Sequence, residues 1–429
     1  MPEAIGSEPP GPAVEVVHLS CLLGGPVLGG DGHRVGRLAD VIAWLGDGGY
    51  PPLTGLVVKI DGRDRFAHIR EVASLDRGEV RLAVDPSGLG PFERRPGEVL
   101  LARDLLARHL IHVKGARLVR ANEIELACIR GRWEVMGVDP TSRPVLRRLL
   151  PRSLRRRVRT GATVDWADIE PFVAHVPTAR LRIPFRKLAR LHPAQLADLV
   201  EAASHDEGEE IIQAVGADRE LEADVFEELD AEHQVEFLRS RSDPEAARVL
   251  GAMAPDDAVD LLEELDQERR LPILLLLPPA SQSKLRALLS YHPETAGGLM
   301  NPDFVAVPAS RTVGEALGAV RSSSAPPEAA TVVLVTDDAG QLTGVVPVVE
   351  LLRAEPAATL GAVAHTDPVA LAPDADVHEV LRTMSDYNLA IAPVVDPDGR
   401  VLGQISVDDV LELLLPEGWR RQYGMTSPG

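Results

Sequence analysis

Short sequence patterns recur at fixed spacings within this chain of 429 residues, and this repetition restricts the fold more than any other feature. The segment VFEELDAE at Val225 returns as LLEELDQE at Leu261, 36 residues later. Apolar residues around both copies follow a helical period, and repeats of this length with that period indicate stacked helix pairs. We therefore expect a helical solenoid over residues 184–299.

A second repetition lies nearer the N-terminus, with a constant shift of 83 residues. The pairs that share it are Leu22-Leu23 with Leu105-Leu106, Gly32 with Gly115, Arg34 with Arg117, and Arg37 with Arg120. Around the first copy, short runs of β-forming residues alternate with turn signals such as Asp61-Gly62. This pattern predicts two similar small β-barrels, over residues 16–90 and 98–177.

A third repetition covers the C-terminal part, where helical and strand patterns alternate. The apolar run Val332 to Val335, followed by Asp337 and Gly340, is answered by Ile391 to Val395, Asp396 and Gly399. We expect two α/β units, over residues 300–356 and 357–416, that pair into one module. The fold class predicted for the whole chain is multidomain α+β: small β-barrels, an α-helical solenoid and an α/β pair.

Charge is distributed unevenly around the net value of −20. Residues 198–268 hold 24 Asp and Glu against four Arg, whereas residues 143–159 hold eight Arg and no acid. A basic run can attract phosphates, yet no aromatic residue interleaves with this one and the rest of the chain is acidic. We expect the basic segment 143–159 to pair with acidic parts of the protein, and we expect no nucleic-acid partner.

No segment reads as membrane-spanning, because a spanning helix needs about 20 predominantly apolar residues. The longest apolar run, Leu271 to Leu277, is interrupted by Pro272, and the acidic N-terminus lacks the basic start of a signal peptide. Cys21 and Cys128 have no CxxC partner, as expected of thiols in a reducing compartment. We expect a cytoplasmic protein with a disordered start (1–15), a short tail (417–429) and no transmembrane segment.

Catalytic constellations are not recognisable in the sequence. The twelve histidines form no HExxH or HxH cluster, and neither a Ser-His-Asp arrangement nor a phosphate-binding glycine loop can be assigned. The sequence therefore favours a protein that is not an enzyme.

An acidic stripe runs along the helix expected to begin near Pro255. Asp256, Asp260 and either Glu263 or Glu264 fall at i, i+4 and i+7 or i+8, opposite an apolar face that includes Leu261. One interpretation is a solvated face that aids solubility. The other is a surface for Mg²⁺, which prefers oxygen ligands and is held through a few carboxylates.

The segment SYHPETAGGLMNPDFVAV, from Ser290 to Val307, resembles the junction between the cytosolic helical domain and the cystathionine-β-synthase (CBS) domain pair of the MgtE magnesium channels and transporters. Both C-terminal α/β units resemble CBS motifs. Both N-terminal units resemble the PRC-barrel family. The first keeps the pattern as LLGGPVLGGDGHRVGRLAD, and the second is degenerate, with Glu123 for its last Asp.

In the MgtE family, acids on the solenoid face acids on the CBS pair, and Mg²⁺ joins them into a compact form. This resemblance implies metal ligands at Asp256, Asp257 and Asp260, with Glu263 added from the acidic stripe. On the CBS side it implies Asp386, Asp408 and Asp409. Asn388 departs from the pattern, because relatives often have an acid there.

The function implied by the resemblance is a soluble Mg²⁺-sensing regulatory protein. We expect it to control a separate membrane metal transporter, which would bring it to the inner face of the membrane. A homodimer through the CBS pair is also implied. We expect the chain alone not to transport metal.

The alternative function is a CBS module that senses an adenosine nucleotide such as ATP, with the solenoid as a scaffold for protein interactions. CBS modules carry a Gly-x-hydrophobic-Ser/Thr-x-x-Asp signature, matched here from Gly403 to Asp409. The Ser406 hydroxyl would take phosphate and Asp409 the ribose hydroxyls. By family analogy the base side is formed by Thr366, Ile391 and Pro393. Ser-x-x-Asp is also an ordinary helix cap, so both interpretations stay open.

Overall fold

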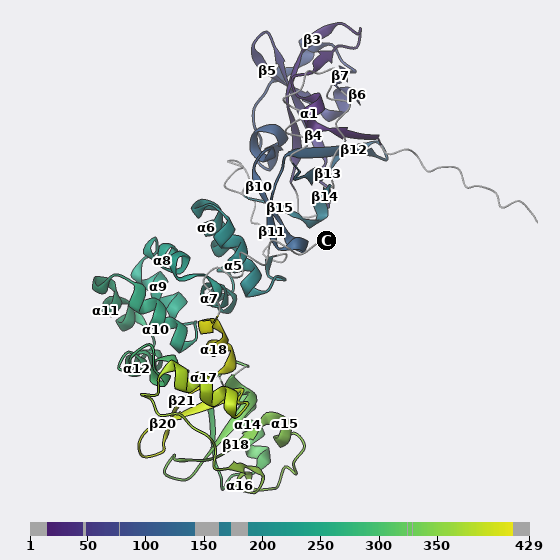
Figure 1. The fold of residues 1–429 in the computed structure, drawn as a ribbon. Coiled ribbons are helices and arrows are strands. Elements are labelled where there is room, and N and C mark those ends of the chain that lie inside the picture. Colours follow the sequence, from purple (N-terminus) through teal and green to yellow (C-terminus); the bar gives the residue numbers. More distant parts are fainter. Residues whose placement is uncertain are drawn as a thin grey trace, which may run out of the picture. The chain divides into compact units, whose positions relative to one another are not determined.

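The computed structural model describes residues 15–45, 49–76, 78–141, 163–172, 188–323, 325–327 and 329–414. The chain divides into two compact units, Met1–Ala217 and Asp218–Gly429, and strands dominate the first in Figure 1. The basic segment 143–159, the tail 417–429 and all but the last residue of the expected disordered start lie outside the described residues.

The first unit is built mainly of short strands, with a helical turn α1 (Leu19–Leu22) and two helices, α5 (Pro193–Ala202) and α6 (His205–Val215), at its C-terminal end. Its strands are β1 (Glu15–His18), β2 (Pro26–Leu28), β3 (Arg34–Trp44), β4 (Leu53–Ile60), β5 (Arg63–His68), β6 (Val72–Asp76), β7 (Glu79–Leu82), β8 (Gly90–Pro91), β9 (Glu98–Leu100), β10 (His109–His112), β11 (Arg117–Arg120), β12 (Glu123–Ile129), β13 (Arg132–Asp139), β14 (Val164–Asp165) and β15 (Ile169–Pro171).

These strands form three sheets that follow open paths. The largest has the order β6-β7-β2-β3-β4-β5-β8, with β9 paired to β3; the others are β1-β12-β13-β14 and β11-β10-β15. The expected duplication into strand-rich units is present, and in the described residues the sheets of these units stay open and do not close into barrels.

The two copies exchange their first strands, which explains why neither closes on itself. β9 starts at Glu98 and is the equivalent of β1, which starts at Glu15, under the 83-residue shift. β1 pairs antiparallel with β12 of the second copy, and β9 pairs antiparallel with β3 of the first copy. Each copy therefore supplies a strand to the sheet of the other.

Two buried carboxylates reinforce this exchange. Asp40 accepts the backbone N–H groups of Ala102 (2.8 Å) and Arg103 (3.1 Å), at the start of the helical turn in the second copy. Glu123, its equivalent under the same shift, accepts the backbone N–H of Ser20 (2.9 Å) and the Ser20 hydroxyl, at the start of α1. Burial raises the pKa of Asp40 to about 6, although these backbone bonds oppose the rise. Each carboxylate caps the helical turn of the other copy.

One apolar core is shared by the two copies. Leu22, Val41 and Leu56 from the first copy belong to the same buried cluster as Leu105 and Leu126 from the second. Because the core, the strands and the carboxylate caps all cross between the copies, we expect them to fold as one body.

The second unit begins with stacked helices: α7 (Arg219–Glu228), α8 (Ala231–Arg239), α9 (Asp243–Leu250), α10 (Pro255–Glu264), α11 (Gln267–Leu276), α12 (Pro279–Leu288) and the short α13 (Ala296–Leu299). The 36-residue repeat corresponds to the pairs α7–α8 and α10–α11. In both, a leucine ends the first helix and an aspartate precedes the second: Leu229-Asp230 and Leu265-Asp266. The prediction of stacked helix pairs is confirmed.

The remaining residues form the two α/β repeats of the C-terminal module. The first contains β16 (Val305–Pro308), α14 (Val313–Ser322), β17 (Val332–Thr336), β18 (Leu342–Pro347) and α15 (Val348–Leu351). The second contains α16 (Leu360–Val363), β19 (His365–Thr366), α17 (Val377–Asp386), β20 (Ile391–Val395), β21 (Val401–Ser406) and α18 (Val407–Leu414). Gln404 Nε2 donates to Ala329 O at 2.7 Å and joins β21 to the first repeat. Among the described residues, no helix has both the length and the apolar character needed to cross a membrane.

Candidate functional site

The N-terminal end of α10 places an acidic side chain against the C-terminal module. Pro255 occupies the first turn of the helix, where its missing N–H is not needed. Ala254, which cannot cap with its own side chain, donates its backbone N–H to Glu227 Oε1 on α7 at 2.6 Å. Leu261 and Leu262 are buried on one face, so Asp256 projects from another.

Asp256 meets polar groups from two segments of the C-terminal module. Asn301 Nδ2, just after α13, donates a hydrogen bond to Asp256 Oδ1 at 3.0 Å. Asp409, in the first turn of α18, lies close enough for its charge to act on Asp256. Glu227 and Asp260 add further negative charge. The structure therefore brings carboxylates from α7, α10 and α18 together.

The electrostatics of this cluster disfavour full ionisation. Burial is the largest cause that raises the pKa of Asp256, to about 7, and repulsion from Asp409 is the next. Burial also raises the pKa of Asp409, while two hydrogen bonds with Ser406 oppose the rise. The repulsion between the two carboxylates is mutual, and Ser406 additionally stabilises the charge of Asp409. A proton or a cation at this place would relieve the repulsion.

Asp260 extends the cluster along α10 but is less enclosed. Burial by surrounding protein raises the pKa of Asp260 to about 6, and Glu263 and Glu264 add to the rise. The Asp260 side chain nevertheless reaches solvent, so screening reduces the energy of these repulsions.

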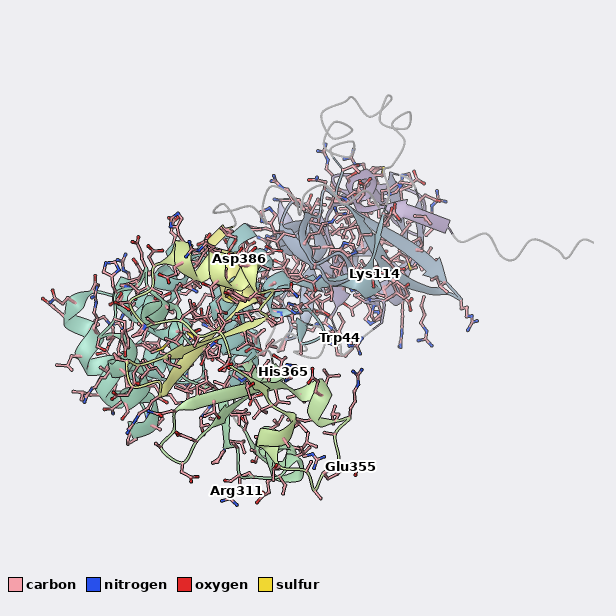
Figure 2. All side chains as sticks on the ribbon, turned by 60° about the horizontal axis from the view of Figure 1, so that its bottom comes forward. Trp44, Lys114, Arg311, Glu355, His365 and Asp386 are labelled. Atoms are coloured by element: carbon pink, nitrogen blue, oxygen red, sulfur yellow. The ribbon has the colours of Figure 1, made fainter. Side chains whose placement is uncertain are left out.

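The other sequence-predicted metal ligands occupy less central places. Asp257 and Glu263 are half-buried on α10, and Asp408 is exposed at the start of α18. Asp386 is exposed at the C-terminal end of α17, where Figure 2 labels it. Of the predicted acids, the structure relates Asp256 directly to Asp409 and Asp260. Asp386 and Asp408 are not among the acids whose charge acts on Asp256.

Two residues of this site were not predicted from the sequence. Glu227 occupies the same place in the 36-residue repeat as Glu263, which was predicted, so the repeat offered a signal for it. The sequence has no such signal for Asn301, because its contact with Asp256 depends on the tertiary course of the chain after α13.

The donor set fits a hard divalent cation. Carboxylates on separate helices act on Asp256 through their charge in a partly desolvated place, and their mutual repulsion is what a divalent charge offsets. The Asn301 amide donates to Asp256 Oδ1, and this hydrogen bond does not involve the other carboxylate oxygen of Asp256. Mg²⁺ retains several waters and needs only a few carboxylates, so it suits this arrangement.

The nucleotide residues predicted from the sequence fall into two groups. Ile391 pairs with Ser406, and Pro393 with Gln404, in the hairpin formed by β20 and β21. Gly403 is in the same hairpin, and a Cβ added there would lie 2.8 Å from Asn301 O. Thr366 is exposed on β19, in the sheet of the first repeat.

Ser406 and Asp409 bond to each other in this structure. Ser406 N–H donates to Asp409 Oδ2 at 3.0 Å, and Asp409 N–H donates to the Ser406 hydroxyl at 3.2 Å. This reciprocal pair forms an ordinary helix cap, which is one of the two interpretations that the sequence left open. In the first repeat, Glu350 stands at the position of Asp409, and its Oε2 lies 2.8 Å from Nε2 of His365, an exposed residue that Figure 2 labels.

Family models match the second half of the chain. The "MgtE intracellular N domain" matches residues 191–294, and the "CBS domain" matches residues 296–357 and 360–416. The resemblance of the N-terminal units to PRC-barrels remains a prediction.

Curated relatives are similar over the same region. The magnesium transporter MgtE of Thermus thermophilus is 33% identical over 200 residues, which are 46% of this chain and 44% of that protein. The magnesium transporter MgtE of Bacillus subtilis is 26% identical over 194 residues, 45% of this chain and 43% of that protein. The chain thus matches less than half of the length of either relative.

Solved structures give the same assignment. A crystal structure of the cytosolic domain of the Mg²⁺ channel MgtE in complex with ATP is 30% identical, with a TM-score of 0.51. The match covers 54% of this chain and 94% of that one. The soluble part of a magnesium transporter is 26% identical with a TM-score of 0.50, and the match covers 53% of this chain and 90% of that one.

Proposed function

From the premise that the chain contains an MgtE intracellular N domain followed by a CBS domain pair, we propose that it is a Mg²⁺-sensing regulatory protein. Mg²⁺ binds between the solenoid and the CBS pair, offsets the repulsion of their carboxylates and stabilises the docked arrangement. Asp256 and Asp409 are the principal ligands, with Asp260 and Glu227 around them. Asp257, Glu263, Asp386 and Asp408 are secondary candidates from the family resemblance.

The observation that carries this proposal is the approach of Asp256 to Asp409. Two carboxylates from different domains repel each other across a partly buried contact. Two unit charges about 4 Å apart repel by roughly 1 kcal/mol in water and by roughly 4 kcal/mol at the effective dielectric near a protein surface. The docked arrangement therefore carries an electrostatic cost that a divalent cation removes, which makes docking dependent on Mg²⁺ concentration.

Small-angle X-ray scattering with and without millimolar Mg²⁺ tests the proposal. We expect the protein to become more compact with Mg²⁺, and Asp256→Ala plus Asp260→Ala to abolish the change. A matched control is Glu232→Ala plus Glu236→Ala, which removes two exposed acids of α8 at the same i, i+4 spacing. Dimensions of the unmodified protein that do not depend on Mg²⁺ would reject the proposal.

The wider part of the proposal concerns the target of the sensor. The cytosolic domain of one relative is part of a Mg²⁺ channel. By analogy, the target here is a membrane metal transporter in another polypeptide. The docked and undocked forms present different surfaces to this transporter. The protein then acts without catalysis, in the cytoplasm and at the inner face of the membrane. Crosslinking in cells at low and high Mg²⁺, followed by identification of membrane proteins, tests this part.

A homodimer through the CBS pair belongs to the same proposal. Leu352 on the first repeat and Tyr387 and Leu411 on the second expose 66%, 62% and 49% of their surface, which is high for large apolar residues. Sedimentation equilibrium of the protein and of Leu411→Glu measures the association. A monomer at all accessible concentrations would contradict it.

A second candidate function is adenosine-nucleotide sensing, favoured by the ATP in the complex of the related cytosolic domain. Here ATP would bind near Ser406, with Ile391, Pro393, Gly403 and Thr366 around it. Calorimetry with ATP, ADP and AMP tests this function, and no heat with any of them at millimolar concentration would exclude it.

A further inference from the structure

Asn301 links the two domains through its side chain. Only 8% of the residue is exposed, and both ends of its carboxamide are bonded. Nδ2 donates to Asp256 Oδ1 at 3.0 Å, and Oδ1 accepts the backbone N–H of Asp303 at 2.8 Å. Because only the nitrogen end of a carboxamide can donate, this pair of bonds sets the orientation of the amide.

The backbone of Asn301 is attached to the strand that leads into α18. Its N–H donates to Gln404 O at 2.8 Å, and Gln404 N–H donates to Asn301 O at 3.0 Å. Gln404 lies on β21, which ends at Ser406, the residue that caps the turn containing Asp409. One residue therefore connects the segment that carries Asp409 to the carboxylate of Asp256.

A second link strengthens the same junction. Asp303, which binds Asn301 Oδ1 through its backbone, forms an ion pair with Lys284 on α12 through its side chain. Helix α12 packs against α10, which carries Asp256. The turn from Asn301 to Asp303 is thus held by both solenoid helices, through side-chain bonds that need no metal ion.

We propose that Asn301 is a positioning residue that holds Asp256 near Asp409 before Mg²⁺ binds, and so sets the Mg²⁺ concentration at which the domains dock. This inference rests on the proposed function. The amide N–H stabilises charge on Asp256 where Asp409 opposes it, and hydrogen bonds to charged groups are stronger than neutral ones. Part of the repulsion is then offset without metal, so less Mg²⁺ completes the docking.

The test is a Mg²⁺ titration of the radius of gyration for the full chain and two variants. Asn301→Ala removes the donor, and we expect its Mg²⁺ midpoint to rise about tenfold, the effect of one charged hydrogen bond. Asn301→Asp keeps the shape but adds a carboxylate. We expect it to be more extended than the unmodified protein without Mg²⁺, fully compact at saturation, and steeper in its dependence on Mg²⁺.

Gln341→Ala is the matched control, because it removes an amide hydrogen bond to Asp398 O within the CBS pair, outside the docking contact. Its midpoint should not move. Thermal unfolding checks that each variant folds, so that a shifted midpoint with an unchanged unfolding temperature reports positioning. Midpoints of both Asn301 variants equal to that of the unmodified protein would overturn the inference.

Failure of the proposed function has a different signature, in which the unmodified protein does not respond to Mg²⁺. The metal-free dimensions then decide about Asn301. A compact unmodified protein and an extended Asn301→Asp variant would support the positioning role, whereas equal dimensions would overturn it.

Discussion

Asp256 on α10 and Asp409 on α18 come from different domains, yet the charge of Asp409 helps to hold the pKa of Asp256 far above its ordinary value of 3.8. Asn301 donates to the same Asp256 carboxylate, so one half-buried acid receives both a favourable and an unfavourable contact from the CBS side. From this balance we expect the docked arrangement to be sensitive to cations and to protons.

Removing one charge of the pair should remove the need for metal. Asp256→Asn keeps an oxygen that can accept from Asn301 but ends the repulsion with Asp409. We expect the variant to be compact without Mg²⁺ at pH 8 and to respond weakly to its addition, as measured by scattering. An extended metal-free variant would contradict a role for this repulsion.

Acidification should favour docking in the absence of metal. The pKa of Asp256 rises from 3.8 to about 7 in the docked arrangement, so this arrangement binds a proton more tightly than the undocked one. The contribution of the protonated Asp256 to docking is fully present below pH 3.8 and is lost as pH rises through about 7. Scattering without Mg²⁺ should therefore show the protein opening between about pH 5 and pH 8.

The same proton should compete with Mg²⁺. Metal binding needs ionised carboxylates, so the Mg²⁺ midpoint should increase as pH falls below about 7. Calorimetric titrations in buffers of different ionisation heat measure the protons released on binding. Binding without proton release at pH 6.5 would show that Mg²⁺ does not bind the Asp256 carboxylate.

The exchanged caps in the first unit should contribute to its stability. Glu123→Gln replaces one carboxylate oxygen with an amide that cannot accept from Ser20, and we expect a loss of about 1 to 3 kcal/mol. Chemical denaturation of the full chain measures the free energy of unfolding. Glu125→Gln, on the same strand, is the control, and an equal loss in both variants would argue against a special role for the cap.

Substitution of Ser406 tests whether this residue acts only as a helix cap or also binds a nucleotide. Ser406→Ala should lower stability by about 0.5 to 2 kcal/mol, because it removes the hydroxyl that accepts from Asp409 N–H. If ATP also binds there, the affinity measured by calorimetry should fall in the same variant. Thr312→Ala, which loses a comparable cap at α14, is the control and should leave any ATP affinity unchanged.

The sequence predicted the local architecture better than the contacts between copies. Repeat spacing and periodicity located the helix pair that contains Val225 and its counterpart at Leu261, because helix faces are encoded locally. Strand exchange between β1 and β9 was not predictable in this way. A strand has the same alternating pattern whether it pairs within its own copy or with the other.

Some residues of the candidate site could be predicted from the sequence and others could not, for a similar reason. Asp256 and Asp260 belong to a helical stripe that the sequence displays directly. The approach of Asp409 was implied by family resemblance, since no periodicity links α10 to α18. Asn301 and Glu227 depend on tertiary contacts, which a single sequence does not specify.

The most direct test of the central claim is the distance between the solenoid and the second CBS repeat as a function of Mg²⁺. Nitroxide labels at Glu236→Cys and Ser385→Cys, with Cys21 and Cys128 replaced by Ser, would report it by pulsed electron paramagnetic resonance. We predict that millimolar Mg²⁺ converts a broad distribution at pH 8 into one narrow distance, and that Asp256→Ala plus Asp409→Ala prevents this. A distribution unchanged by Mg²⁺ in the labelled parent protein would contradict the account.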